Sequence, residues 1–174
     1  MSGPREALAI SDGVLSASIL PYGASLVDLH HSGWHHPLVL GFPNRDDYVD
    51  AVHYSGAIVG RCANRIAKGR PLIGGREYQL DCNVGSYHHH GGKTGLARQD
   101  WLVLAHGADR IELAMQSPDG HEGYPGNLSV NAVYDLPRAG VLRLTIRAQS
   151  DQTTLLNLCH HPYFNLAPRG GVER

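Results

Sequence analysis

The sequence predicts an all-β protein folded as an antiparallel sandwich or barrel, and three observations support this class. Apolar and polar residues alternate along several short runs, as expected where one face of a strand is buried. Turn-forming residues separate these runs, and the chain holds 21 glycines and 10 prolines. No segment keeps the helical apolar period of about 3.6 residues. With 174 residues, 42% of them hydrophobic and 18% charged, we expect one globular domain.

The expected elements begin near the N-terminus. Residues 14–20 alternate like a half-buried strand, and Pro21-Tyr22-Gly23 ends this run. Residues 24–29 resume the strand pattern, with Leu26 and Leu29 as apolar members. A short helical turn is expected around residues 46–48.

The second half of the chain carries longer alternating runs. They predict strands at residues 111–115, 128–134 and 142–148. Turn clusters at residues 117–120 and 137–140 separate these strands. A turn at residues 149–151 followed by the run 154–158 predicts a further antiparallel strand beside 142–148.

Composition excludes several classes of function. The formal net charge is −1 and no run of Lys and Arg is present, which disfavours a nucleic-acid partner. No apolar stretch approaches the roughly 18 residues of a membrane span, and the N-terminus lacks the pattern of an export signal. Cys62, Cys82 and Cys159 form no CxxC pair, so we expect reduced thiols in a cytoplasmic protein.

Twelve histidines are the compositional peculiarity, and most fall in clusters. A metal site needs ligands that share one face of an element, whereas adjacent histidines on a strand point to opposite faces. His88 and His90 are expected to share a face, but no convincing set of Cys, His and carboxylate ligands stands out. We therefore expect no metal and no cofactor. The histidines between residues 30 and 36 are interpreted as a polar surface turn.

The segment 56–69 is rich in glycine and carries Arg61 and Arg65. It lacks the strand–GxxxxGK[ST]–helix pattern of a phosphate loop, so that interpretation is rejected. The rigid guanidinium fork of Arg65 suits oxygen-rich ligands. The alternative is that Arg61 and Arg65 pair with surface carboxylates.

Three further segments combine turn residues with groups able to transfer protons or bind ligands. Tyr87 to Gly92 places a histidine at a tight glycine turn, where the backbone lets a ligand approach. The loop 117–126 is turn chemistry that also presents Tyr124 as a candidate ring-stacking platform. The segment 157–166 holds His160 and His161, whose alternative role is that of a core histidine bonded to a strand carbonyl.

Taken together and in this order, these segments resemble the aldose 1-epimerases (galactose mutarotases). The matching pieces are GRCANRIAKGR at residues 60–70, HHGG at 89–92 with Trp101 downstream, SPDGHEGYPGNLSV at 117–130 and NLCHHPYFNL at 157–166. The resemblance runs from about Pro21 to Leu166. It implies the galactose mutarotase-like supersandwich, a large antiparallel β-sandwich that binds a hexose in an open cleft. Residues 1–174 would then be the N-terminal part of a single domain of this kind.

The resemblance also implies a reaction and roles for individual residues. The family interconverts the α and β anomers of a free aldose such as galactose or glucose by acid/base ring opening. His161 matches the family's acid, and His90 matches the histidine that assists at the ring oxygen or binds a hydroxyl. Arg65 matches the sugar-binding arginine, with Asn64 beside it. Tyr124 and Trp101 are candidates for shaping the cleft.

The sequence departs from the family pattern in two respects. His160 stands where relatives commonly have Asn, and Pro162 follows the proposed acid, so the strand there must be an edge or distorted. The family's catalytic Glu and a sugar-binding Asp map beyond Arg174. We therefore expect a truncated sandwich with impaired activity that self-associates through exposed sheet edges.

Two alternatives to the epimerase remain open at this point. One is a carbohydrate-binding module of the same fold that has no catalytic activity. The other is a metal-dependent β-barrel enzyme of cupin type that would use His88, His90 and His161.

Overall fold

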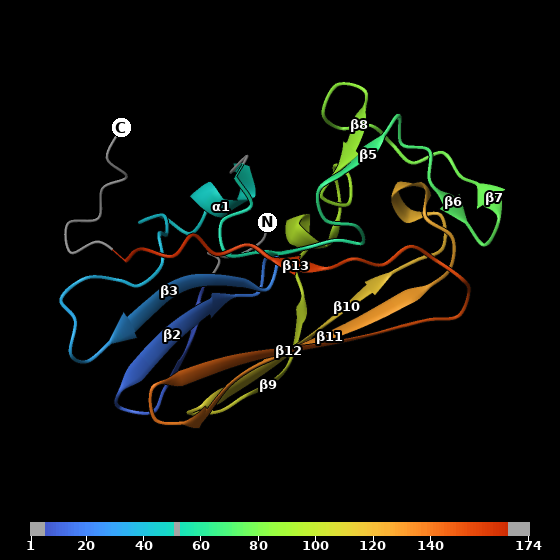
Figure 1. Cartoon of the computed structure of the whole chain (residues 1–174). Coiled ribbons are helices and arrows are strands. Elements are labelled where there is room, and N and C mark those ends of the chain that lie inside the picture. The colour runs from blue at the N-terminus through green and yellow to red at the C-terminus, as the bar shows by residue number, and fades with distance from the viewer. Residues whose placement is uncertain (1–5, 51–52, 167–174) are drawn as a thin grey trace.

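The computed structural model describes residues 6–50 and 53–166, whose main body is two antiparallel sheets packed face to face (Figure 1). The first sheet has the order β1-β2-β3, from strands β1 (Leu8–Ser11), β2 (Leu15–Leu20) and β3 (Ser25–His31). The second has the order β12-β11-β10-β9, from strands β9 (Leu102–His106), β10 (Arg110–Ser117), β11 (Leu128–Arg138) and β12 (Val141–Ser150). The predicted all-β antiparallel sandwich is confirmed.

The main core lies between the two sheets and follows directly from the alternation. In β10, Ile111 and Leu113 point inward and are fully buried, while Arg110 on the same strand is exposed. They join inward side chains of the other sheet, among them Ile10, Leu15, Ala17, Ile19, Leu26 and Leu29. Burial of these side chains is the principal force holding the sheets together, at roughly 1.5–3 kcal/mol for each large aliphatic side chain.

One predicted strand is wrong. Residues 154–158 form no strand beside β12, because their backbone groups bond elsewhere. The Asn157 N–H donates to the Arg61 carbonyl at 2.9 Å, and the Ala63 N–H donates to the Asn157 carbonyl at 2.7 Å. The chain then enters β13 (Cys159–His160), which pairs with β4 (Ile58–Val59). Alternation predicts an extended segment there but does not reveal its neighbour.

The remaining elements are short and carry the candidate site. They are the expected helical turn α1 (Asp47–Asp50) and the small strands β5 (Arg65–Ala67), β6 (Leu72–Ile73), β7 (Arg76–Glu77) and β8 (Tyr87–His89). Two 3-10 turns lie at Leu96–Arg98 and His121–Gly123. The paired strands β5 and β8 and the β6–β7 hairpin stand above the β10–β11 sheet, and β13 crosses beneath β8 toward β3 (Figure 1). No helix within the described residues is long and apolar enough to cross a membrane.

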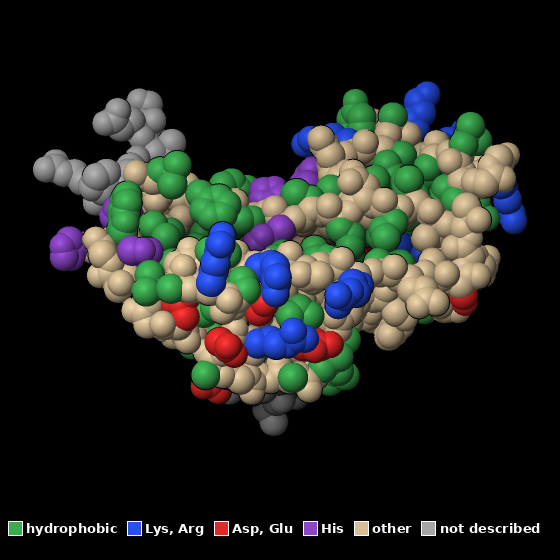
Figure 2. Space-filling view, turned by 60° about the horizontal axis from the view of Figure 1, so that its bottom comes forward, with side chains coloured by type: hydrophobic (Ala, Val, Ile, Leu, Met, Phe, Trp, Pro, Cys, Tyr) green, Lys and Arg blue, Asp and Glu red, His purple; other side chains and the backbone are tan. Residues whose placement is uncertain are grey.

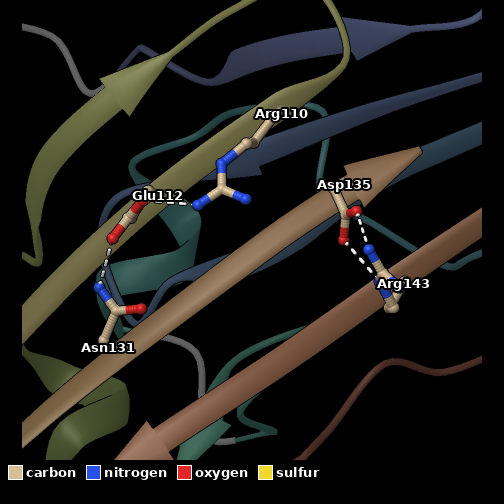
Figure 3. A network of polar contacts seen from close by, with 5 residues as sticks. All are labelled: Arg110, Glu112, Asn131, Asp135 and Arg143. Carbon is tan, nitrogen blue, oxygen red and sulfur yellow. Dashed lines mark hydrogen bonds and ion pairs between the residues drawn. The ribbon is translucent and has the colours of Figure 1, made fainter. Parts of the chain in front are cut away.

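The outer face of the second sheet is polar and solvated. Arg143 pairs with Asp135 through two bonds of 3.0 and 2.5 Å, and Arg110 pairs with Glu112 at 2.7 Å (Figure 3). Asn131 extends the second pair by donating to Glu112 at 2.9 Å. Figure 2 shows basic and acidic side chains interspersed on the side of the molecule that it presents. Exposed pairs of this kind add at most about 1 kcal/mol each and chiefly keep the face soluble.

The inner side of β12 remains partly open. Strand β12 is an edge of its sheet, and Leu142 and Leu144 are only partly buried. With Phe164, which is 62% exposed, they line an apolar groove of about 340 Å³ between the two sheets. An apolar groove beside an unpaired strand edge is a surface prone to association.

Candidate functional site

The candidate site is built around a reciprocal pair of hydrogen bonds between Asn64 and His90. The Asn64 N–H donates to His90 Nδ1 at 3.1 Å, and the His90 N–H donates to the Asn64 carbonyl at 3.0 Å. The antiparallel pairing of β5 with β8 places them together, because its register pairs Arg65 with His89. The structure thus brings together three residues that the sequence nominated separately: Asn64, Arg65 and His90.

The backbone at the site is unusual. Tyr54, Asn64 and His90 all have positive φ, with values of 54°, 63° and 52°. Non-glycine residues rarely adopt this left-handed conformation, and such residues gather at functional sites. The turn after His90 needs glycine for space as well, since a Cβ on Gly91 would lie 1.6 Å from the Gly60 carbonyl oxygen.

His161 reaches the same place from a segment far from His90 in the sequence. Its N–H donates to the Ala57 carbonyl and its carbonyl accepts from the Gly56 N–H, both at 2.9 Å, just beyond the two-residue strand β13. Strand β13 ends at His160, so Pro162 lies beyond the strand and not at an edge or distorted position within it. The His161 ring then meets the His90 ring edge to face, with centroids 5.4 Å apart and planes at 86°.

Two other aromatic groups complete the cluster, and the sequence did not nominate either of them. Tyr54 lies with its ring centroid 4.8 Å from that of His90 and 6.5 Å from that of His161. His89 stacks at a tilt on His90, with centroids 3.9 Å apart. The occurrence of the HHGG motif together with the segment 60–70 could have indicated His89. No sequence motif indicates Tyr54.

The electrostatics of the cluster favour a neutral His90. Burial, aided by the neighbouring His89, His161 and Arg65, lowers the pKa of His90 to about 4. Because His90 Nδ1 accepts a hydrogen bond from the Asn64 N–H, the single proton of the neutral ring lies on Nε2. His90 is therefore a hydrogen-bond donor through Nε2 at neutral pH.

A pocket of about 350 Å³ adjoins this cluster. Its lining is Tyr54, Arg65, Asn83, Val84, His89, Lys93 and Arg98. Arg65 is exposed there and donates to the Asn64 side-chain oxygen at 3.3 Å, while Arg98 lies over the Tyr54 ring at 5.0 Å. Among the described residues, no Asp or Glu lines this pocket. Its volume and its donors suit a ligand about the size of a monosaccharide that is rich in oxygen atoms.

The expectation of a sugar platform at Tyr124 needs correction. Tyr124 is only 1% exposed, and its hydroxyl lies 2.7 Å from His88 Nε2. The other His88 nitrogen, Nδ1, lies 2.7 Å from the Asp81 carbonyl. Tyr124 thus supports β8 from below and presents no ring surface. Trp101 is likewise a core residue, 2% exposed and bonded to the Leu96 carbonyl, rather than a wall of the cleft.

Pairing of Arg61 with a surface carboxylate is also wrong. Arg61 is 2% exposed, and its guanidinium donates to uncharged oxygens of Ser117, Pro118, Pro125 and Thr154. Burial lowers the pKa of this group. Arg61 therefore connects the segment 60–70 to the loop after β10 through buried hydrogen bonds.

The two adjacent histidines, His160 and His161, face opposite sides, as alternation predicted. His160 points inward, where its Nε2 lies 3.0 Å from the Tyr134 hydroxyl, and burial lowers its pKa to about 4. The cupin-type ligand set is not assembled either. Both ring nitrogens of His88 already face Asp81 and Tyr124, so this ring does not converge with His90 and His161.

Comparisons with a family profile and with individual proteins all match aldose 1-epimerases or galactose mutarotases. The profile of the family described as Aldose 1-epimerase matches residues 6–174. A galactose mutarotase from Mus musculus is 42% identical over 173 residues, which are 97% of this chain and 49% of that protein. An aldose 1-epimerase from Escherichia coli is 31% identical over 152 residues, 86% of this chain and 44% of that protein. The chain thus spans about half the length of the relatives it matches.

Solved structures agree with the sequence matches. An aldose epimerase homologue from C. elegans superposes with a TM-score of 0.87 at 30% identity, covering 93% of this chain and 51% of the other. A galactose 1-epimerase from Lactobacillus acidophilus superposes with a TM-score of 0.81 at 33% identity, covering 90% of this chain and 47% of the other.

Proposed function

The chain belongs to the aldose 1-epimerase family, and on that premise we propose that it binds a free hexose, such as galactose or glucose, beside His90 and His161. The proposed reaction interconverts the α and β anomers of the sugar. The single observation that carries the proposal is the meeting of the His90 and His161 rings, 5.4 Å apart, next to a pocket into which Arg65 extends.

The chemistry requires one proton to move at each of two oxygens. The bond between C1 and the ring oxygen breaks, the ring oxygen gains a proton, and the C1 hydroxyl loses one as C1 becomes an aldehyde carbon. Rotation about the C1–C2 bond and reclosure in reverse give the other anomer. A positioned acid and base typically accelerate such a step by 10²–10⁴-fold each.

His161 is assigned as the acid that protonates the ring oxygen, and His90 as a donor that holds the sugar. Burial lowers the pKa of His90 to about 4, so at neutral pH this ring offers the sugar a hydrogen-bond donor and carries no positive charge. Arg65 and Asn64 supply donors and an acceptor for hydroxyl groups, and the fork of Arg65 fixes the sugar's orientation. Tyr124 acts indirectly, through the strand that it supports.

A non-catalytic sugar-binding function is the second candidate. The observation that favours it is the absence of any Asp or Glu from the pocket lining within the described part of the chain. A general base is needed to remove the C1 hydroxyl proton, and the described residues that line the pocket include no carboxylate.

Polarimetry combined with a binding measurement tests both candidates. Freshly dissolved α-glucose or α-galactose is followed with and without the protein, and affinity is measured by NMR titration. The epimerase is supported if the optical rotation changes faster with protein than in buffer alone, and if that rate rises in proportion to protein concentration. Sugar binding without a rate increase supports the non-catalytic sugar-binding function. Absence of sugar binding excludes both candidate functions.

Two further parts of the proposal concern the environment and association of the chain. The free thiols of Cys62, Cys82 and Cys159 support a reducing compartment such as the cytoplasm. The unpaired edge of β12 and the apolar groove beside it support self-association of the isolated chain.

A further inference from the structure

A continuous line of hydrogen bonds joins buried Arg61 to buried Glu122 beneath the His90 turn. Arg61 Nε donates to Ser117 Oγ at 3.0 Å, and Ser117 Oγ lies 2.9 Å from His121 Nδ1. His121 Nε2 lies 2.9 Å from Thr94 Oγ1, which donates to Glu122 Oε1 at 2.5 Å. Ser117, His121 and Thr94 therefore connect the buried side chain of Arg61 to that of Glu122.

With His121 in its neutral form, the donors and acceptors fit one arrangement of protons. The guanidinium can only donate and the carboxylate can only accept, which fixes the direction at both ends. Thr94 gives its single proton to Glu122, so His121 must donate from Nε2 to Thr94. A neutral His121 then accepts at Nδ1 from the Ser117 hydroxyl. The line therefore selects the Nε2–H tautomer of His121, and each hydroxyl in it both donates and accepts.

Glu122 also accepts hydrogen bonds from the loop that follows His90. Its Oε1 accepts from the Thr94 N–H at 2.5 Å, in addition to the Thr94 hydroxyl. Its Oε2 is buried against Gly92, where an added Cβ would lie 2.1 Å from that oxygen. The front of the same loop is held by the two bonds between His90 and Asn64. The loop of residues 90–94 is thus fixed at both ends.

We propose that Thr94 and Glu122 are positioning residues that set the orientation of the His90 ring, with His121 relaying the constraint from Arg61. Neither Thr94 nor Glu122 lines the pocket, so both act through His90. The orientation of the His90 ring follows from the contacts of the loop alone. Its effect on hexose affinity rests on the proposed function.

Thr94→Val and Thr94→Ser form a matched pair for the test. Valine keeps the shape of threonine and removes the hydroxyl, whereas serine keeps the hydroxyl. Two quantities are read in the intact chain: the imidazole ¹H–¹⁵N signals of His90 and His121, and the affinity for glucose. For Thr94→Val we expect mixed tautomers at His121, shifted His90 signals and an affinity about fivefold weaker, the equivalent of one hydrogen bond. Thr94→Ser should match the parent protein.

A control separates positioning from simple loss of stability. Ile10→Val loosens the main core far from this loop, so it should lower the melting temperature and leave the His90 signals unchanged. The proposal is overturned if Thr94→Val leaves both the His90 signals and the affinity at parental values. If the parent protein binds no glucose, the proposed function fails, while the imidazole signals still decide the positioning claim.

Glu122 provides a second comparison at the other end of the loop. Glu122→Gln keeps an oxygen that accepts from Thr94, and Glu122→Ala removes it. We expect Glu122→Gln to retain most of the parental His90 signals and Glu122→Ala to shift them. An Ala variant that folds with parental His90 signals would contradict the proposal as directly as an unaffected Thr94→Val.

Discussion

His161 and His90 meet edge to face at 5.4 Å, although His90 comes from the middle of the described chain and His161 from near its end. Their backbones are held by different partners: His90 by Asn64, and His161 by Gly56 and Ala57. The contact between the rings is therefore a product of the fold, and neither local segment can make it alone.

Replacing His161 by Asn should abolish anomer interconversion and leave sugar binding nearly intact. Asparagine can still hydrogen-bond a hydroxyl but cannot deliver a proton near neutral pH, and loss of such a group costs about 10²–10⁴-fold in rate. Polarimetry measures the rate and NMR titration the affinity. Cys159→Ser, an exposed change in the same segment, is the control and should match the parent. Unchanged turnover in His161→Asn would refute the assigned role.

Replacing Arg65 by Lys should weaken hexose binding about tenfold, since a lysine ammonium cannot reproduce the planar guanidinium fork. Arg65 has no carboxylate partner among the described ion pairs, so the change should scarcely affect folding. Titration calorimetry provides the affinity, and Arg147→Lys on the outer face of β12 is the matched control. Equal affinities for the two variants would exclude Arg65 from the binding site.

Stability should fall as the pH falls from about 6.5 toward 4. Burial lowers the pKa of His160 from 6.5 to about 4, so the unfolded chain binds this proton first. The stabilisation is complete above pH 6.5 and is lost as the pH drops to the folded-state pKa. At pH 5 the loss due to His160 alone is about 2 kcal/mol. Urea unfolding at pH 7.5 and pH 5 measures it, and His160→Asn should show a flatter pH dependence. A parallel pH dependence in that variant would contradict the assignment to His160.

Replacing Tyr124 by Phe should cost about 1–3 kcal/mol of unfolding free energy, because His88 Nε2 loses its partner inside the protein. Sugar affinity should stay within about twofold, since the ring is buried beneath β8. Chemical denaturation and NMR titration measure the two quantities. A large loss of affinity without a loss of stability would restore Tyr124 to the binding surface.

Replacing Leu144 by Lys should reduce self-association of the chain. An inward-pointing charge on an edge strand is a natural device against edge pairing, and Leu144 lines the groove beside β12. Analytical ultracentrifugation over a concentration series measures the effect. Gln149→Lys adds the same charge at an exposed position of the strand and serves as the control. A parent protein that stays monomeric throughout the series would disprove the association itself.

The sequence predicts the strands of the sandwich well because one buried face imposes alternation. It does so for β2, β10, β11 and β12, each of which appears where residue patterning placed it. It fails at residues 154–158, where the pattern indicates an extended chain but the partner is the segment at residues 61–63. Pairing between distant segments depends on the assembled fold, which local alternation does not encode.

In the candidate site, too, some features follow from local sequence patterns and others depend on the assembled fold. The motifs predict Asn64, Arg65, His90 and His161 as site residues, and these four residues converge in space. Tyr124 was misjudged because a turn-rich loop predicts exposure, whereas Arg61 and His88 draw this tyrosine inward. Tyr54 was missed because its position follows from a left-handed backbone that no motif marks.

The hydroxyl of Tyr134 has a consequence for how such a protein can change over generations. It donates to the Ala24 carbonyl at 2.8 Å and lies 3.0 Å from His160, the residue before His161. The packed interior and His161, the proposed acid, are therefore only one residue and one hydrogen bond apart. If His161 has that role, substitutions that repack the interior near Tyr134 will also alter the proposed reaction.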